Sequence, residues 1–285
     1  MRGAGTIMAY AVREGVRRRV FVVVLILTAV FLGLYGWGVS AVVDEVRVAG
    51  PAGNLVEVDV VAAATLLGLS MFGTLFLGAV LAAFLTLGVV RGDAERGLLQ
   101  PLVVRPVGRA TVILARTAAA GAIAGVYSAA VFLGAVLITG GFTGWWPSSV
   151  VEPALSLAGA VVIVAALSVL GSVAMAATAN GIAVFMVFGA GLVAGLIGQI
   201  GEAISSDTLS TIGRIGSYAL PFEGLYQSAL SSITADTTGL TEVVVRLGPF
   251  GGAHAGGAAM VAWAVAYLAL VAGAAVAAFR RVDLS

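Results

Sequence analysis

The side chains that could carry out chemistry are few, and their types exclude most catalytic classes. The chain contains no Cys and a single His, His254, so a thiolate metal site and a multi-His metal site within one subunit are both excluded. All 15 basic residues are Arg, whereas a phosphate-binding P-loop needs a Lys that reaches the β- and γ-phosphates. No hydrolase motif that combines Ser, His and Asp is found in the sequence. We therefore expect no catalytic residue, no cofactor site and no metal site in this chain.

The densest cluster of charge between two long apolar runs is residues 91–109. Four Arg and two acidic residues, Asp93 and Glu95, occur there, whereas residues 60–90 are free of charge. The same segment carries an apolar stripe made of Leu98, Leu99, Leu102, Val103 and Val104. Pro101 suits the first turn of a short helix. A short, half-apolar helix edged with Arg at a membrane face is suited to contact another protein; the alternative is an ordinary positively charged loop.

Composition indicates which elements must hold this segment in place. The chain is 60% hydrophobic and 10% charged, with a mean hydropathy of +1.10, which is typical of an integral membrane protein. Each crossing of a bilayer core about 30 Å thick needs about 20 apolar residues, so 285 residues accommodate about six crossings and no large soluble domain. We predict an all-α integral membrane protein with six transmembrane helices, at 20–43, 60–90, 110–139, 153–177, 182–200 and 255–279.

Further segments complete this single transmembrane domain. Residues 4–19 place several apolar side chains on one face and end in Arg, which predicts an interfacial (elbow) helix. A cleavable signal peptide is the alternative, but the apolar run that follows is longer than a signal peptide needs, so we expect a retained span. Residues 91–109 are the predicted cytoplasmic coupling segment between the second and third spans, and residues 178–181 a tight cytoplasmic turn. Residues 201–254 are predicted to form extracytoplasmic short helices that cap the outer face or dip into it.

Charge asymmetry indicates the orientation of the spans. With both termini inside, twelve Arg fall on the cytoplasmic side and three outside, while ten of the fourteen acidic residues fall outside. Basic loops are retained in the cytoplasm. We therefore expect a multi-pass protein of a bacterial or archaeal plasma membrane with both termini cytoplasmic. Its basic inner face would attract anionic membrane lipid, and nothing in the sequence indicates nucleic-acid binding.

Residues 95–116 resemble the first cytoplasmic loop of type-2 ABC exporter permeases. The family pattern is an acidic residue, then Gly-Thr-Leu-x-Pro-Leu-Leu-x-x-Pro-(Val/Ile)-Ser-Arg, and Gly-Lys seven residues after that Arg. Here Glu95 precedes a stretch that reads GLLQPLVVRPVGR, followed by Ala115-Arg116. The chain differs from the pattern at Leu98, at Gly108 and in having Ala115-Arg116 for Gly-Lys. The six-span layout is similar to the same family along the whole chain, most of all to the branch that includes the permease of nitrous-oxide-reductase maturation.

The resemblance implies that this loop holds a coupling helix that docks in a groove of a nucleotide-binding subunit. The positions that would contact the ATPase are Glu95, Gly97, Leu98, Pro101, Leu102, Pro106, Arg109 and Arg116. It also implies two ATP-binding-cassette ATPase subunits, which hold the ATP and Mg, and a second permease copy in a homodimer or heterodimer. Gly191 and Gly195 in the fifth span are the candidate dimer interface, and packing within the subunit is the alternative.

No predicted span carries a charge in its middle, although such a charge is the usual mark of ion-coupled transport. The spans contain only mildly polar groups, which either bond between helices or line a route for an amphipathic substrate: Ser70, Thr74, Thr86, Ser128, Ser156, Ser168, Ser172 and Gln199. The energy for transport would then come from a partner ATPase. We predict the permease subunit of an ATP-driven exporter; the alternatives are an ion-gradient-driven secondary carrier and a non-transporting membrane anchor or assembly factor. A lipid, drug, peptide or sulfur species all remain open as the substrate.

Overall fold

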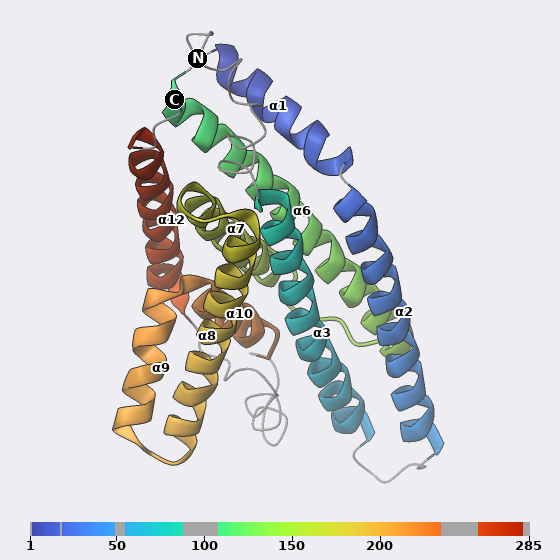
Figure 1. Cartoon of the computed structure of the whole chain (residues 1–285). Helices are drawn as coiled ribbons and strands as arrows, with labels where there is room; N and C mark the ends of the chain where they lie inside the picture. The colour runs from blue at the N-terminus through green and yellow to red at the C-terminus, as the bar shows by residue number, and fades with distance from the viewer. Residues whose placement is uncertain (1, 18, 49–54, 88–107, 235–255, 282–285) are drawn as a thin grey trace.

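The structure is a computed structural model, and it describes residues 2–17, 19–48, 55–87, 108–234 and 256–281 (Figure 1). These ranges form helices and short connections, which confirms the predicted all-α fold. The helices, in chain order, are α1 (Arg2–Arg17), α2 (Arg19–Val48), α3 (Leu55–Thr86), α6 (Arg109–Thr143), α7 (Val151–Ala174), α8 (Ala177–Ala203), α9 (Asp207–Ala219), α10 (Pro221–Thr234) and α12 (Gly257–Arg280).

Among the described residues, six helices are long and apolar enough to cross a membrane: α2, α3, α6, α7, α8 and α12. The predicted number of spans is therefore confirmed. The connection between the fourth and fifth spans was predicted at the wrong residues. Residues 178–181, predicted as a tight turn, lie inside α8, and the chain turns instead at Met175 and Ala176. The polar residue that indicated a turn, Asn180, is fully buried and donates a hydrogen bond to α7, so it does not need to face water.

Helices α3 and α7 form the centre of the bundle. Their spanning segments are the most buried of the six, and they pack against each other, against α6 and against α10. The largest core cluster joins side chains from these four helices, among them Leu67, Phe132, Leu157 and Phe222. The spanning segments of α2, α8 and α12 are the least buried, and α2 exposes apolar side chains such as Leu34 and Trp37. One buried and one exposed apolar face is what a helix needs when its outer side contacts lipid.

Helix α1 lies along the first half of α6 (Figure 1). Gly15 is buried there, with a Cβ at this position only 2.8 Å from Ile123 of α6 and 3.3 Å from Leu85 of α3. Met8 and Tyr10 are exposed on the same helix. The helix expected from residues 4–19 is therefore present as α1, while its position at a membrane interface stays a prediction.

The segment after α8 returns into the bundle. Helices α8 and α9 form a helical hairpin (Figure 1), in which a Cβ added at Gly213 would lie 2.2 Å from the Cα of Gly198. Only glycine permits two helices to approach this closely. Helix α10 begins at Pro221, which suits a first helical position, and its Phe222 and Tyr226 are buried in the core. Of the two arrangements expected for residues 201–254, α10 shows the one that dips into the bundle.

Candidate functional site

Most of the predicted coupling positions fall outside the described residues. They are Glu95, Gly97, Leu98, Pro101, Leu102 and Pro106. The two helices that flank them are described, because α3 ends at Thr86 and α6 begins at Arg109. The coupling helix stays a prediction, and the structure describes the supports at its two ends.

The two remaining coupling positions, Arg109 and Arg116, lie on α6. Arg109 is the first residue of the helix and follows Gly108, whose backbone is extended. Arg116 is half-buried and lies seven residues later, about two turns further along α6. The start of α6 lies at the same end of the molecule as the start of α1 and the end of α12 (Figure 1). This is the end that the sequence predicts to be cytoplasmic.

The end of α3 is hydrogen-bonded to α7, and α7 is hydrogen-bonded in turn to α8. The hydroxyls of Thr86 and Ser168 are hydrogen-bonded 2.5 Å apart, and the side-chain amide of Asn180 donates to the Ser168 carbonyl at 3.0 Å. Leu87 lies against the first turns of α8, since a Cβ at Gly181 would be 2.9 Å from its Cδ2. The three polar side chains are fully buried. A displacement of the chain just after Thr86 therefore acts on two other spans.

Other mildly polar side chains of the spans bond within their own helices. Ser70, Thr74 and Ser172 each donate to a main-chain carbonyl of the preceding turn. Ser128 is fully buried, and its hydroxyl has no hydrogen-bond partner among the described residues. These positions favour packing inside the subunit over a substrate lining. Gln199 differs from them because it is half-buried and borders a cavity.

Gly191 and Gly195 face α10 of the same chain. A Cβ at Gly191 would lie 2.5 Å from the ring of Phe222, and a Cβ at Gly195 would lie 2.0 Å from Oε1 of Glu223. Both glycines are buried. The close approach that their spacing permits is therefore used inside the subunit, which was the alternative to a dimer interface. A dimer contact through these residues stays a prediction, and this face of α8 is already covered by α10.

A buried carboxylate that the sequence analysis did not single out lies on α10. Glu223 is 1% exposed; its Oε2 accepts a hydrogen bond from Ser217 at 2.5 Å, and its Oε1 accepts one from the side-chain amide of Gln227. Both carboxylate oxygens thus have a donor, which a buried acid requires. The sequence signal was the spacing of Glu223 and Gln227, one helical turn apart in a segment that also contains the apolar residues Phe222 and Leu225.

Tyr226 lies in the same helix close to this carboxylate. Burial is the main cause, and the negative charge of Glu223 the second, of a pKa of the Tyr226 phenol that is raised well above its ordinary value of 10.0. The phenol is therefore neutral at physiological pH.

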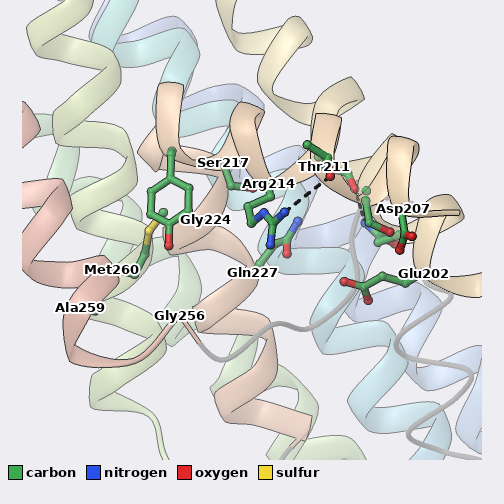
Figure 2. A pocket seen from close by; sticks show the side chains of 16 residues that line it. Glu202, Asp207, Thr211, Arg214, Ser217, Gly224, Gln227, Gly256, Ala259 and Met260 are labelled. Atoms are coloured by element: carbon green, nitrogen blue, oxygen red, sulfur yellow. Dashed lines mark hydrogen bonds between the residues drawn. The ribbon is translucent and has the colours of Figure 1, made fainter. Parts of the chain in front are cut away.

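A cavity of about 420 Å³ lies between α8, α9, α10 and the start of α12 (Figure 2). This volume falls in the range of roughly 300–1,000 Å³ that small-molecule sites occupy. Charged and exposed side chains border it: Glu202, Asp207 and Arg214. Buried residues also line it: Gly195, Gly213, Gly224, Gln227 and Met260. In Figure 2 Arg214 points to Thr211, to which its guanidinium donates at 3.5 Å.

Comparison with known families identifies the class of protein. The model of the ABC-2 family transporter protein matches residues 6–284. The chain belongs to the ABC-2 family. An ABC-2 family member is the transmembrane subunit of an ABC transporter, it is not itself catalytic, and it associates with ATPase subunits. No curated protein matches the sequence.

For this ABC-2 protein, the family resemblance drawn from residues 95–116 is confirmed at the level of the permease family. It is also a multi-pass membrane protein, as its apolar helices indicate. Helix α3 ends at Thr86, before the predicted coupling segment, and α6 begins at Arg109, the last residue of that segment. Glu223 belongs to α10, and the cavity lies between α8, α9, α10 and α12. Of the residues that line this cavity, the sequence analysis singled out Gly195 and Gln199, and it predicted no binding site there.

Proposed function

We propose that this ABC-2 protein is the permease of an ATP-driven exporter, in which two permease subunits form the pathway and two ATPase subunits drive it. The observation that most supports ATPase coupling is the bonding of Thr86 to Ser168, close before the predicted coupling segment. A segment that only connects two spans does not need its upstream end bonded to α7, and through Ser168 and Asn180 to α8. A segment that transmits force does.

In this proposal the apolar side chains of Leu98 and Leu102 insert into a groove of the ATPase, and Gly97 permits the turn before them. Arg109 and Arg116 anchor the start of α6 to headgroups or to carboxylates of the partner. When ATP draws the two ATPase subunits together, the coupling segments follow. The end of α3 then displaces α7 and α8 through Thr86, and α8 carries α9 and α10 with it.

The proposal also covers the composition of the transporter and its location in the cell. ATP and Mg bind to the ATPase subunits, and the second permease copy is either identical or a related chain. Both termini and residues 91–109 face the cytoplasm of a bacterial or archaeal cell. Within the family, the branch that includes the permease of nitrous-oxide-reductase maturation is the proposed relative.

The test is the variant Leu102→Asp, which places a charge in the proposed apolar contact. The matched control is Gly5→Asp, which adds the same charge to α1, where a Cβ meets no neighbour within 4 Å. We expect Leu102→Asp to abolish co-purification with the ATPase partner and to leave the thermal unfolding of the permease unchanged. The control should keep the partner. If Leu102→Asp retains both the partner and transport driven by ATP, the proposed coupling contact is wrong.

One observation favours a second candidate function, an ion-gradient-driven carrier. Glu223 is a carboxylate buried within the bundle, and buried acids in membrane proteins commonly bind transported ions or protons. The two functions separate when cellular ATP is depleted while an ion gradient is kept. Transport that persists under this condition and stops in Glu223→Gln would support the carrier, whereas transport that follows ATP would support the exporter.

A further inference from the structure

The polar side chains of the cavity between α8, α9, α10 and α12 indicate which kind of ligand it would bind. Ser217 and Gln227 both line it, and each directs a donor hydrogen at Glu223, behind the cavity wall. A Ser hydroxyl has a single proton, so Ser217 offers the cavity only its acceptor lone pairs. The Gln227 carbonyl is likewise an acceptor, although the amide of the same side chain keeps one N–H besides the one directed at Glu223. Ser217 and the Gln227 carbonyl therefore suit a ligand that donates hydrogen bonds.

The charged side chains around the cavity also favour a particular ligand, namely a cation. Glu202 and Asp207 border it as carboxylates, against the single guanidinium of Arg214. Glu223 lies at the buried side, and a cation bound in the cavity would favour the charged form of this carboxylate. The exposed carboxylates therefore attract a cation, and Glu223 can supply a further counter-charge once the cation is bound.

The opposite side of the cavity is apolar. Ala259 and Met260 from the start of α12 lie there, and Tyr218 also lines the cavity. Figure 2 draws Met260 and Ala259 toward one end and Glu202 and Asp207 toward the other, with Arg214 and Gln227 between them. Met side chains are flexible and adapt to apolar groups of different shape. The cavity is thus amphipathic, with a negative part and an apolar part.

We propose that this cavity binds the protonated amine of an amphipathic organic cation, and that this cation belongs to the substrate class of the transporter. The amine would lie against the Gln227 carbonyl and the Ser217 oxygen, with Glu223 balancing its charge. The hydrocarbon part would lie against Met260 and Tyr218. The second half of the proposal, that the bound cation is transported, rests on the proposed function.

The test uses the full chain in lipid nanodiscs without ATP and without the ATPase, so the binding result is independent of coupling. Radiolabelled octylamine is the probe, and empty nanodiscs report its partition into lipid. Octanol and octanoate, which have the same chain length without the positive charge, are the competitors. We expect saturable binding of octylamine that neither competitor displaces and that weakens as salt concentration rises.

Three variants locate the site. Glu223→Gln should weaken octylamine binding about tenfold, because it keeps the shape of the side chain and removes the carboxylate that would balance the charge of the bound amine. Because Glu223→Gln changes a core residue, a second variant carries Glu202→Gln and Asp207→Asn, both at exposed positions. Octylamine binding to this double variant should be about threefold weaker. Glu152→Gln removes an exposed acid at the start of α7, outside the cavity, and should bind as the unmodified chain does.

Equal competition by octanoate or octanol would overturn the proposal, and so would unchanged binding in both the Glu223 variant and the double variant. If octylamine binds as expected but is not carried by the assembled transporter with ATP, the assignment as a transported substrate is wrong. Failure of Leu102→Asp to uncouple the ATPase would overturn the proposed function and leave the binding result standing.

Discussion

The hydroxyls of Thr86 and Ser168 lie 2.5 Å apart in the buried centre of the bundle, where they join the last residue of α3 to α7. The variants Thr86→Val and Ser168→Ala each remove one hydroxyl. We expect each to lower the free energy of unfolding by about 0.6 kcal/mol, the average for hydrogen bonds between membrane helices. The double variant should cost little more than either single variant, because both remove the same bond.

The measurement is equilibrium unfolding in detergent, followed by the ATPase rate of the assembled transporter. The matched control is Thr117→Val, because the Thr117 hydroxyl donates to the Ile113 carbonyl of its own helix and, among the described residues, bonds to no second span. The ATPase rate should respond to the Thr86 and Ser168 variants and not to the control. Strictly additive effects on stability would show that the two hydroxyls do not act as a pair.

The α8–α9 hairpin depends on glycine at position 213. In Gly213→Ala the new Cβ would lie 2.2 Å from the Cα of Gly198, and main-chain atoms cannot move aside as a side-chain end can. We expect the free energy of unfolding to fall by about 1–3 kcal/mol, which is typical of an overpacked core. Gly189→Ala is the control, because a Cβ there meets no neighbour within 4 Å, and it should stabilise the helix by up to about 1 kcal/mol. Thermal unfolding compares the two variants; similar melting temperatures would contradict the proposed close contact.

Alkaline pH should destabilise the core through Tyr226. Its folded-state pKa is raised above the ordinary value of 10.0, so the unfolded chain releases the phenolic proton first. The stability that Tyr226 contributes is therefore complete below about pH 10 and is lost as the pH rises toward the folded-state pKa. Between about pH 9 and about pH 11, the melting temperature of the unmodified chain should fall more steeply than that of Tyr226→Phe. Parallel curves for the two proteins would exclude this role for Tyr226.

Two polar pairs hold α2, the least buried span, to α6. The Tyr35 and Thr139 hydroxyls are 2.5 Å apart, and the Thr28 and Tyr127 hydroxyls are also hydrogen-bonded. In Tyr35→Phe and Tyr127→Phe the ring packing remains while one bond is lost. We therefore expect α2 to separate from α6 more often, by about threefold for each lost bond of average strength.

Thiol labelling can measure this separation, because the chain has no Cys and each introduced thiol is unique. Val39→Cys places the thiol at a fully buried position of α2, and Leu34→Cys places it at an exposed position of the same helix. The Tyr variants should accelerate labelling at position 39 and leave position 34 unchanged. Unchanged labelling at position 39 would show that apolar packing alone holds α2.

The spans were predictable because each is an uninterrupted apolar run longer than a bilayer requires. The turn at residues 178–181 was predicted wrongly because an Asn usually lies in a turn exposed to water. Here the Asn180 side chain of α8 is buried and donates a hydrogen bond to Ser168 of α7. A contact between residues twelve positions apart on different helices has no local sequence signal. The coupling positions from Glu95 to Pro106 lie outside the described residues and stay predictions.

Helix α10 shows a second limit of sequence reasoning. Its Glu223, Gln227 and Ser228 are polar, which favours a helix at the membrane surface, yet all three are buried. Glu223 lies inside because Ser217 and Gln227 supply its donors and because Gly195 leaves room for its carboxylate. These conditions come from three different helices. The apolar periodicity of one helix cannot reveal them, whereas the short spacing between Glu223 and Gln227 could have drawn attention to the pair.

The burial of α10 also bears on how the protein is made. Helix α10 packs against α3, α7 and α8, which leave the ribosome before it, and against α12, which leaves after it. A nascent chain halted at the end of α8 would have spans for a membrane but a vacant slot where Phe222 and Ile233 belong. The slot would be filled only when synthesis reaches α10, and α12 would then close over it. Biogenesis of this protein should therefore include a late step in which α10, which is too short to cross the membrane, packs between the spanning helices and completes their core.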